Sequence, residues 1–227
     1  EGMMSIIVKE LSKIYGSGEN RVTALDRASM EICDRDFISI VGPSGSGKST
    51  LLHLISGLDR PTSGTVLYDG KDIHSGSDRV LSAFRRRNIG FIFQQFNLLP
   101  VLTARENIMM PLLLDRRRPD ETDLNRIAGL LGIAGRLDHL PGELSGGQQQ
   151  RVAVARALIA GPNIIFADEP TGNLDTKSGN EVMDLLAGIQ ENMNKTLIVI
   201  THDQRVARMA KRQFSIVDGI LTEVTAS

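Results

Sequence analysis

The chain has 227 residues, a formal net charge of -1, 41% hydrophobic residues and 23% charged residues. This length supports one large domain or a domain with a subdomain, and the near-zero charge excludes bulk electrostatic capture of nucleic acid or anionic lipid. Cys33 is the only cysteine, which excludes an internal disulfide and fits a reducing compartment.

No segment of the sequence predicts a membrane span or a secretory leader. A span needs roughly 20 apolar residues, whereas the apolar run at residues 108–114 is short and contains Pro111. The N-terminus lacks a basic stretch followed by an apolar core. Glu1 and Gly2 precede Met3, so we interpret them as residues left from expression. We expect a cytoplasmic protein, whose membrane-spanning part, if it works at a membrane, belongs to another chain.

Strands are predicted in the first half of the chain. Apolar runs indicate them at residues 5–8, 28–32, 37–41 and 89–94. The strand at 37–41 leads directly into a glycine-rich loop. A helix follows that loop, because apolar residues recur with a helical period over 51–58, and Gly57 and Pro61 mark its end.

Helical patterns replace the strands over residues 97–160, which we interpret as an insertion in the core. Its last helix begins with Ser145 and Gln148 at the spacing of a capping box and stops at Gly161. The predicted organisation is a single domain over 3–225. Residues 3–94 and 161–225 form the core with a β subdomain, and residues 95–160 form a helical subdomain.

The α/β pattern resumes after the insertion. Strands are predicted at 164–167 and 196–201 and helices at 177–192 and 204–210, and Asp218-Gly219 predicts a hairpin between 214–217 and 220–224. Such alternation is typical of a mostly parallel sheet with helices on both faces.

Residues 42–49 match the phosphate-loop pattern G-x-x-x-x-G-K-[ST], between a strand and a helix. The loop and the residue after it are Gly42, Pro43, Ser44, Gly45, Ser46, Gly47, Lys48, Ser49 and Thr50. Backbone N–H groups of such a loop converge on phosphate oxygens. Lys48 is placed to neutralise the β- and γ-phosphates, and Ser49 to offer its hydroxyl to Mg²⁺. The alternative is a glycine- and serine-rich turn before a helix.

Two acids, Asp168 and Glu169, follow the apolar run 164–167. They are therefore expected at the carboxyl end of a central strand, where open α/β sheets bind ligands. Asp168 is placed to hold Mg²⁺ and Glu169 to polarise the attacking water. The alternative is a pair of solvated acids at a strand end.

These motifs, in this order, resemble the ATP-binding cassette (ABC) ATPases. The most specific part of the resemblance is a match to the family's signature motif: Leu144-Ser145-Gly146-Gly147-Gln148-Gln149-Gln150-Arg151. The resemblance covers about residues 6–224. It implies an α/β fold of the P-loop NTPase (RecA-like) class with a mostly parallel sheet, an antiparallel β subdomain and an inserted α-helical subdomain.

The resemblance also implies roles for residues outside the phosphate loop. Tyr15 matches the aromatic residue that stacks on adenine, and its alternative is a strand-end tyrosine packed on the core. Gln94 matches the glutamine that contacts Mg²⁺ and the attacking water. Gln95 follows it, and we prefer Gln94 because it directly ends the strand. Asp175 matches the loop that crosses between subunits and also suits a helix N-cap. His202 matches the histidine that senses the γ-phosphate.

The signature implies a dimer. Ser145, Gly146 and Gly147 begin a helix whose exposed N–H groups form a second anion site, with Gln148 beside them. In the family this element covers ATP held by another subunit, so two chains bury two ATP molecules. The cofactors implied are ATP and Mg²⁺. Glu169 and His202 are both present, so we expect an active ATPase and an ATP-dependent homodimer with two competent sites.

Two classes of ABC protein compete: the motor subunit of a membrane complex, and a non-transport ATPase acting on nucleic acid or ribosomes. The short spacing between phosphate loop and signature, the single cassette and the net charge favour the motor subunit, with no nucleic-acid partner. Residues 91–100 and 167–175 resemble the group of macrolide and antimicrobial-peptide exporters, lipoprotein-releasing ATPases and a cell-division ATPase.

The resemblance therefore implies a chain peripheral on the inner face of the cell membrane, bound there through a separate permease. The cargo expected is a peptide, drug or lipoprotein. Residues 96–114 are the expected docking surface, although ordinary helical-subdomain core is the alternative. The arginine triplets 85–87 and 116–118 suit a solvated surface, or else contact lipid head groups or an acidic segment of the partner.

Overall fold

The computed structural model describes residues 4–224. Outside this range lie Glu1 and Gly2, interpreted above as residues left from expression, and the predicted domain limits 3 and 225. The chain divides into two compact units. Unit 1 comprises the residues up to Ser82 and those from Thr196 onward, and unit 2 comprises residues 83–195. Across residues 4–224, none of the helices combines the length and the apolar character that crossing a membrane requires.

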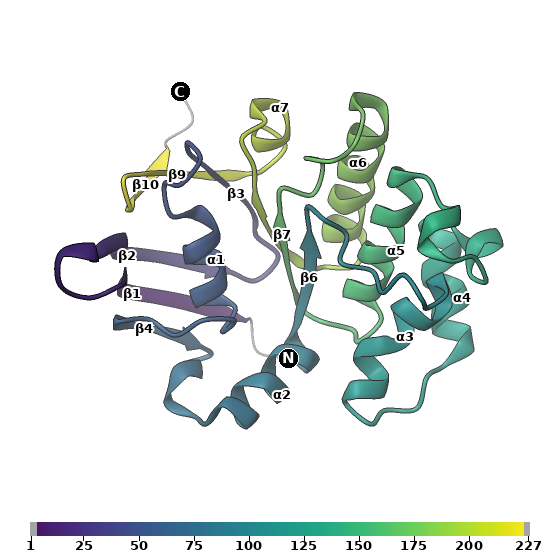
Figure 1. The fold of residues 1–227 in the computed structure, drawn as a ribbon, viewed down its shortest axis with the longest axis horizontal. Coiled ribbons are helices and arrows are strands. Elements are labelled where there is room, and N and C mark those ends of the chain that lie inside the picture. The colour runs from purple at the N-terminus through teal and green to yellow at the C-terminus, as the bar shows by residue number, and fades with distance from the viewer. Residues whose placement is uncertain (1–3, 225–227) are drawn as a thin grey trace. The chain divides into compact units, whose positions relative to one another are not determined.

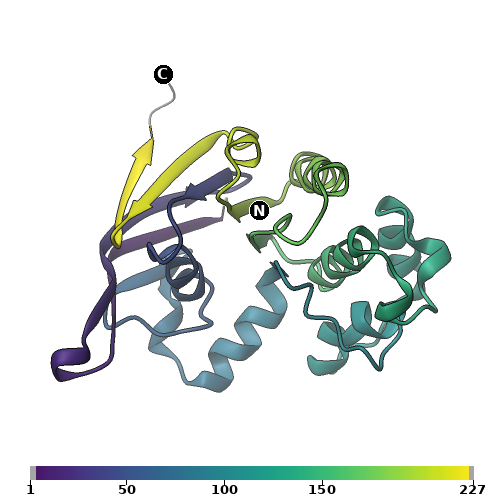
Figure 2. The same ribbon diagram turned by 45° about the horizontal axis from the view of Figure 1, so that its top comes forward.

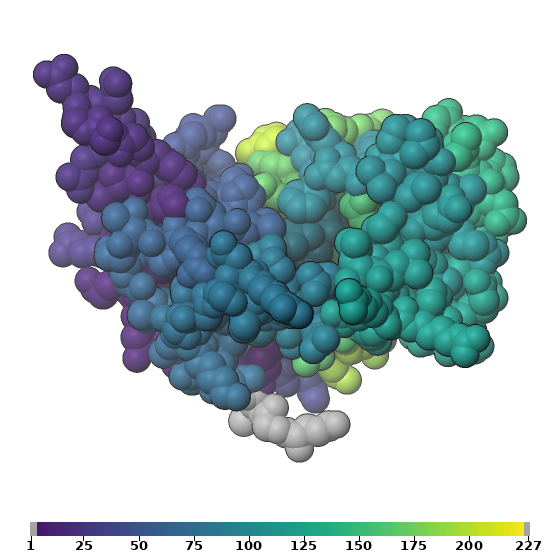
Figure 3. Space-filling view, turned by 60° about the horizontal axis from the view of Figure 1, so that its bottom comes forward, coloured from purple at the N-terminus to yellow at the C-terminus, as the bar shows by residue number. Residues whose placement is uncertain are grey.

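Unit 1 contains an antiparallel sheet with the strand order β2-β1-β4-β5 (Figure 1). Its strands are β1 (Ser5–Tyr15), β2 (Val22–Cys33), β4 (Ser63–Tyr68) and β5 (Lys71–Asp72). In the second half of β2, the buried residues Ala28, Met30 and Ile32 alternate with exposed ones, so one face of the strand packs on the core. The connection between β1 and β2 contains the short helix η1 (Gly18–Asn20) and projects from the unit (Figure 3, purple).

The other strands of unit 1 follow the order β10-β9-β3-β8. They are β3 (Phe37–Val41), β8 (Thr196–Ile200), β9 (Arg212–Val217) and β10 (Ile220–Val224). Strand β3 pairs in parallel with both β8 and β9, and every residue of β3 and β8 is buried, as expected for a parallel sheet. The predicted hairpin is confirmed: Asp218 and Gly219 have φ of 49° and 78° between β9 and β10 (Figure 2, yellow).

The helices of unit 1 are short. Helix α1 (Lys48–Ile55) follows the glycine-rich loop and ends three residues before the predicted end, because Gly57 has a φ of 72°. Helix α7 (Gln204–Ala207) is one turn, shorter than predicted, and η2 (Ile73–Ser75) follows β5. Helix α2 (Asp78–Asn88) carries the chain into unit 2.

Unit 2 is built around two parallel strands, β6 (Ile89–Phe93) and β7 (Ile164–Asp168). The helices between them gather on one side of the unit (Figure 1). These are α3 (Ala104–Leu114), α4 (Glu121–Leu130), η3 (Ala134–Arg136), η4 (Pro141–Glu143) and α5 (Gly146–Leu158). The predicted helix at 177–192 is α6 (Thr176–Asn192), which follows β7 and buries Val182, Leu186 and Ile189. Helix α5 packs against α3, α4, α6 and β6 and is the central helix of the unit.

Candidate functional site

The glycine-rich loop of unit 1 joins β3 to α1 and is fixed by its glycines. Gly47, the N-cap of α1, has a φ of 107°, and a Cβ at this position would lie 2.2 Å from the carbonyl oxygen of Ala24. Gly42 is equally close to Ile216, whose carbonyl oxygen would lie 2.2 Å from an added Cβ. Only glycine fits where another backbone approaches so closely. The loop is therefore held against β2 and β9 in one conformation.

The side chain of Lys48 provides the charge of this loop. Lys48 is buried, at 8% exposed, and its Nζ donates to the carbonyl oxygens of Gly42 and Pro43, both at 2.8 Å. The structure gives it no carboxylate partner among residues 4–224. In the same loop, the hydroxyl oxygen of Ser46 is buried and has no hydrogen-bond partner. A buried cation and an unsatisfied hydroxyl suit an anion with several acceptor oxygens, such as a phosphate.

A cavity of about 150 Å³ opens at this loop. Its lining residues are Ala24, Gly45, Gly47, Lys48, Ser49 and Thr50. The predicted phosphate-loop residues therefore surround a hollow at the N-terminus of α1, where backbone N–H groups favour anions.

Tyr15 ends β1 in unit 1 with 43% of its surface exposed, so it is not a core tyrosine. Its hydroxyl donates to Asp59 at 3.0 Å. Lys13 bridges to Asp59 at 2.8 Å and places its Nζ 5.0 Å from the centre of the Tyr15 ring. Partial burial and the bond to Asp59 raise the pKa of the Tyr15 phenol above its ordinary value. The ring is thus held at its hydroxyl and is accessible for stacking.

His202 is exposed and follows β8. Strands β3 and β8 pair in parallel with Ile40 opposite Ile200. Because parallel strands end at the same edge, the phosphate loop after β3 and His202 after β8 leave this sheet on one side. Unit 1 thus brings His202 to the same sheet edge as the loop that holds Lys48.

Unit 2 presents Gln94 and Glu169 at the ends of neighbouring parallel strands. In the β6–β7 register Phe93 lies opposite Asp168, so Gln94 and Glu169 are the next residues of their strands. Glu169 has a φ of 49°, a strained conformation for a residue other than glycine. Gln94 Nε2 donates to Asn173 Oδ1 at 3.4 Å, and Asn173 Nδ2 donates to the Gln94 carbonyl oxygen at 3.0 Å. These bonds connect Gln94 with the loop that ends at Asp175.

The predicted capping box of α5 is confirmed. Ser145 Oγ accepts from the Gln148 N–H at 3.2 Å, and Gln148 Oε1 accepts from the Ser145 N–H at 3.0 Å. The hydroxyl oxygen of Ser145 acts as an acceptor in this cap, which leaves its proton for another acceptor. A Cβ at Gly146 would lie 3.5 Å from Leu174, and one at Gly147 3.3 Å from Ser178. The first turn of α5 therefore packs on the loop before α6 and on the first turn of α6.

Asp175 is the N-cap of α6, which was one of its two expected roles. Its carboxylate accepts from the Ser178 N–H at 3.0 Å and from the Ser178 hydroxyl at 2.6 Å. These hydrogen bonds, the one from the hydroxyl first, hold the pKa of Asp175 below its ordinary value.

Comparison with known proteins identifies the family. Residues 25–172 match the family model described as ABC transporter. The chain belongs to the ABC transporter family.

The chain is similar to ATP-binding proteins of several ABC systems. It is 47% identical to the lipoprotein-releasing system ATP-binding protein LolD of Geobacter metallireducens, over 93% of this chain and 95% of that protein. It is 44% identical to the macrolide export ATP-binding/permease protein MacB of Marinobacter nauticus, over 98% of this chain but only 35% of that longer protein.

The ABC fold is also found by structural comparison. The dimeric structure of cassette MJ0796 of Methanocaldococcus jannaschii matches with a TM-score of 0.87 and 42% identity, over 98% of this chain and 100% of that one. A second structure of MJ0796, a post-hydrolysis state bound to ADP and Pi, matches with a TM-score of 0.86. The predicted fold class and the prediction of an ABC-type, ATP-binding ATPase are confirmed at the level of the family.

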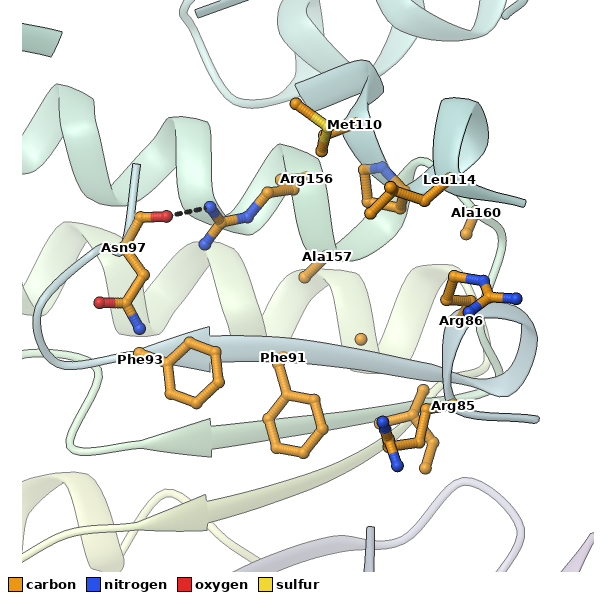
Figure 4. Close-up of a pocket in the computed structure, with 13 residues that line it drawn as sticks. Arg85, Arg86, Phe91, Phe93, Asn97, Met110, Leu114, Arg156, Ala157 and Ala160 are labelled. Atoms are coloured by element: carbon orange, nitrogen blue, oxygen red, sulfur yellow. Dashed lines mark hydrogen bonds between the residues drawn. The ribbon is translucent and has the colours of Figure 1, made fainter. Parts of the chain in front are cut away.

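The ABC cassette has a further cavity, of about 310 Å³, within unit 2 (Figure 4). Its lining combines apolar side chains with three arginines and no acidic residue: Arg85, Arg86, Ile89, Gly90, Phe91, Phe93, Asn97, Met110, Pro111, Leu114, Arg156, Ala157 and Ala160. The docking surface expected from the sequence, residues 96–114, supplies only part of this lining. Phe91 and Phe93, which are half-exposed on strand β6, also line the cavity; their alternation in the sequence could have indicated this part of the lining.

Proposed function

We propose that this chain is the ATP-hydrolysing subunit of a membrane export complex, acting as an ATP-dependent homodimer with a separate permease. One observation carries the proposal: the chain has two distinct groups suited to phosphate. Unit 1 has the cradle of Lys48 and Ser46, and unit 2 has the capped N-terminus of α5 with the Ser145 hydroxyl proton uncommitted. By name, the relative LolD belongs to a lipoprotein-releasing system, and the relative MacB is a macrolide export ATP-binding/permease protein.

In unit 1 the proposed work is nucleotide binding. Lys48 neutralises the β- and γ-phosphates, and the N–H groups of residues 42–50 hold their oxygens. Tyr15 stacks on the adenine, which its exposed and anchored ring supports. His202 is proposed to hydrogen-bond the γ-phosphate from the same edge of the sheet.

In unit 2 the proposed work is activation of water. Glu169 accepts a proton from the attacking water or orients it, and Gln94 holds that water by its side-chain amide. We keep Gln94 over Gln95, since the hydrogen bonds that its side-chain amide and its backbone carbonyl make with Asn173 support a defined position. Ser49, Gln94 and Asp168 offer the oxygen ligands that Mg²⁺ prefers. When bound, Mg²⁺ neutralises charge on the phosphates.

The homodimer follows from the second phosphate group. Ser145, Gly146 and Gly147, with Gln148 in the capping box, are proposed to cover the ATP bound by a second copy, and Asp175 to lie at that contact. ATP bound by both copies stabilises the closed dimer by mass action, and hydrolysis removes that stabilisation. The dimeric structure of the similar cassette MJ0796 supports this proposal.

The cavity of unit 2 is proposed to receive the permease. Its apolar lining, which includes Phe91, Phe93 and Leu114, suits an apolar side chain of the partner. Residues 95–160 are proposed as the helical subdomain. The whole cassette is proposed to comprise residues 3–225, with its core at 3–94 and 161–225.

The complex with the permease would hold the chain at the inner face of the membrane. The alternative, a cell-division-type or non-transport ATPase, is not favoured by the relatives, and the cargo proposed is a peptide, drug or lipoprotein.

The test is Glu169→Gln, which keeps the size of the side chain and removes the carboxylate. We expect the variant to bind ATP, to hydrolyse it very slowly and to elute as a dimer only with ATP, measured by light scattering after size exclusion. Unaltered hydrolysis, or a monomer at saturating ATP, would refute the proposed mechanism.

The proposed partner is tested by identifying the membrane protein that copurifies with the chain from native membranes. Copurifying ribosomes or DNA would contradict the proposal that the partner is a permease.

A further inference from the structure

Helix α5, the central helix of unit 2, forms hydrogen bonds with the segment that follows Gln94. From α5, Arg156 Nη2 donates to the Phe96 carbonyl oxygen at 2.7 Å, and Nη1 donates to the Asn97 carbonyl oxygen. Figure 4 shows the guanidinium extending from the helix to Asn97. One planar group thus holds two consecutive carbonyls, only two and three residues beyond Gln94.

The segment that Arg156 holds is a tight and strained turn. Phe96 has a φ of 36° and Asn97 a φ of 51°, both in the left-handed region. The Asn97 N–H donates back to the Gln95 carbonyl, which closes the turn directly after Gln94. A phenylalanine avoids this region unless its surroundings enforce it. The charge-assisted bonds from Arg156 are the contacts that offset this strain.

Arg156 makes these bonds from a partly buried position, where its charge is less well solvated than that of a surface arginine. It is half-buried, and burial lowers the pKa of its guanidinium. Among the described residues no carboxylate pairs with it, so the two carbonyls are its hydrogen-bond partners. A half-buried cation that binds only backbone oxygens is suited to fixing the path of that backbone.

The other end of α5 also contacts the turn. A Cβ at Gly146, in the signature, would lie 3.9 Å from the ring of Phe96. Arg156 and Asn97 both line the cavity of unit 2. The turn after Gln94 therefore lies beside the signature end of α5 and the Arg156 side chain, and its Asn97 borders the cavity of unit 2.

We infer that Arg156 is a positioning residue, which fixes residues 95–97 and thereby sets the Gln94 amide for hydrolysis. This inference rests on the proposed role of Gln94 in activating water. The hydrogen bonds of Arg156 go to backbone carbonyls of the turn after Gln94, whereas the phosphate loop belongs to unit 1. Loss of Arg156 should therefore slow the chemical step without weakening ATP binding.

The test compares Arg156→Met and Arg156→Lys with Arg117→Met in the full chain. Lysine keeps the charge but loses the pair of planar donors. Arg117 is the matched control, since its Nη1 also donates to a backbone carbonyl of this unit, that of Ala160 at 3.0 Å. We expect kcat to fall at least about tenfold in Arg156→Met and by an intermediate factor in Arg156→Lys. KM for ATP should stay within about twofold, and Arg117→Met should match the parent.

A double-mutant cycle separates positioning from general destabilisation. If Arg156 acts through Gln94, adding Arg156→Met to Gln94→Ala should lower kcat little further. Parent-like kcat in Arg156→Met, or a full additional loss in the Gln94→Ala background, would overturn the inference. If Arg156→Met does not fold, Arg156→Lys takes its place in the cycle. Parent-like kcat in Gln94→Ala alone would instead refute the proposed role of Gln94.

Discussion

The most informative single substitution is Ser145→Ala, because Ser145 combines a structural and a proposed ligand-binding role in one hydroxyl. Its oxygen accepts from the Gln148 N–H and caps α5. Its proton is proposed to bind the γ-phosphate of ATP held by the second copy. The substitution removes both interactions, and they affect different measurable quantities.

The two effects differ in expected size. Loss of an N-cap costs about 1 kcal/mol, which lowers the melting temperature of a chain this long by about 2–4 °C. A hydrogen bond to a charged group contributes about 1.5–3 kcal/mol. A homodimer loses two such bonds, so roughly 3–6 kcal/mol, or about 10²–10⁴-fold in the dimer dissociation constant, is expected.

A second capping box in unit 2 provides the control. Thr103 caps α3: its hydroxyl oxygen accepts from the Glu106 N–H at 3.2 Å, and its own N–H donates to the Glu106 carboxylate at 2.8 Å. Thr103→Ala should therefore cost a similar stability to Ser145→Ala. We expect it to leave ATP-driven dimerisation unchanged, because Thr103 is assigned no contact with ATP.

The assay measures both quantities on the same proteins. Thermal unfolding without nucleotide gives the cap contribution of each residue. Sedimentation with saturating ATP, in the Glu169→Gln background, gives the dimer dissociation constants. Equal weakening of the dimer by Ser145→Ala and Thr103→Ala would refute the reasoning, since the effect would then follow stability alone. A normal dimer in Ser145→Ala would refute the proposed phosphate contact.

Three further predictions concern other residues of the site. Lys48→Ala should lower ATP affinity by at least about 100-fold in a fluorescent-nucleotide titration, because no other buried cation lies in the described loop. Tyr15→Ala should weaken ATP binding about tenfold, and Tyr15→Phe less, since it loses only the bond to Asp59; binding of inorganic triphosphate, which lacks the base, should not change. Asp175→Asn should lower the melting temperature at pH 7, and its difference from the parent should shrink as the pH falls below 3.8. The pKa of Asp175 is depressed in the folded state, so its stabilisation is present above the ordinary value of 3.8 and is lost as the pH falls through the lower folded value.

Features encoded by a few neighbouring residues were predictable from the sequence. The capping box depends on Ser145 and Gln148, three positions apart, and the hairpin depends on Asp218-Gly219 between two apolar runs. The strand–loop–helix context of Lys48 is equally local. In each case the residues that form the sequence motif are also the residues that contact one another, so the motif alone predicts the local structure.

Elements without such a local signal were missed or misjudged. Helix α2 was not predicted, because Leu81 is the only fully buried residue on it and no apolar period arises. Strands β4 and β5 were also not predicted. Strand β1 continues to Tyr15, well beyond the predicted end at residue 8. Irregular pairing after Val8, with Glu10 at a φ of 47°, breaks the alternation there.

The same limit explains why the role of α5 was underestimated. The sequence marks its first turn as the signature, but the later contacts of the helix join residues far apart in the chain. Gln150 is fully buried and donates to the Pro170 carbonyl, directly after Glu169. Arg156 holds the turn after Gln94, about 60 positions away. One rigid helix therefore carries a proposed phosphate-binding end and also contacts the backbone beside both proposed water-activating residues. A displacement of α5 would therefore move its phosphate-binding end and the backbone beside Gln94 and Glu169 together. If three separate loops carried these groups, each could move independently.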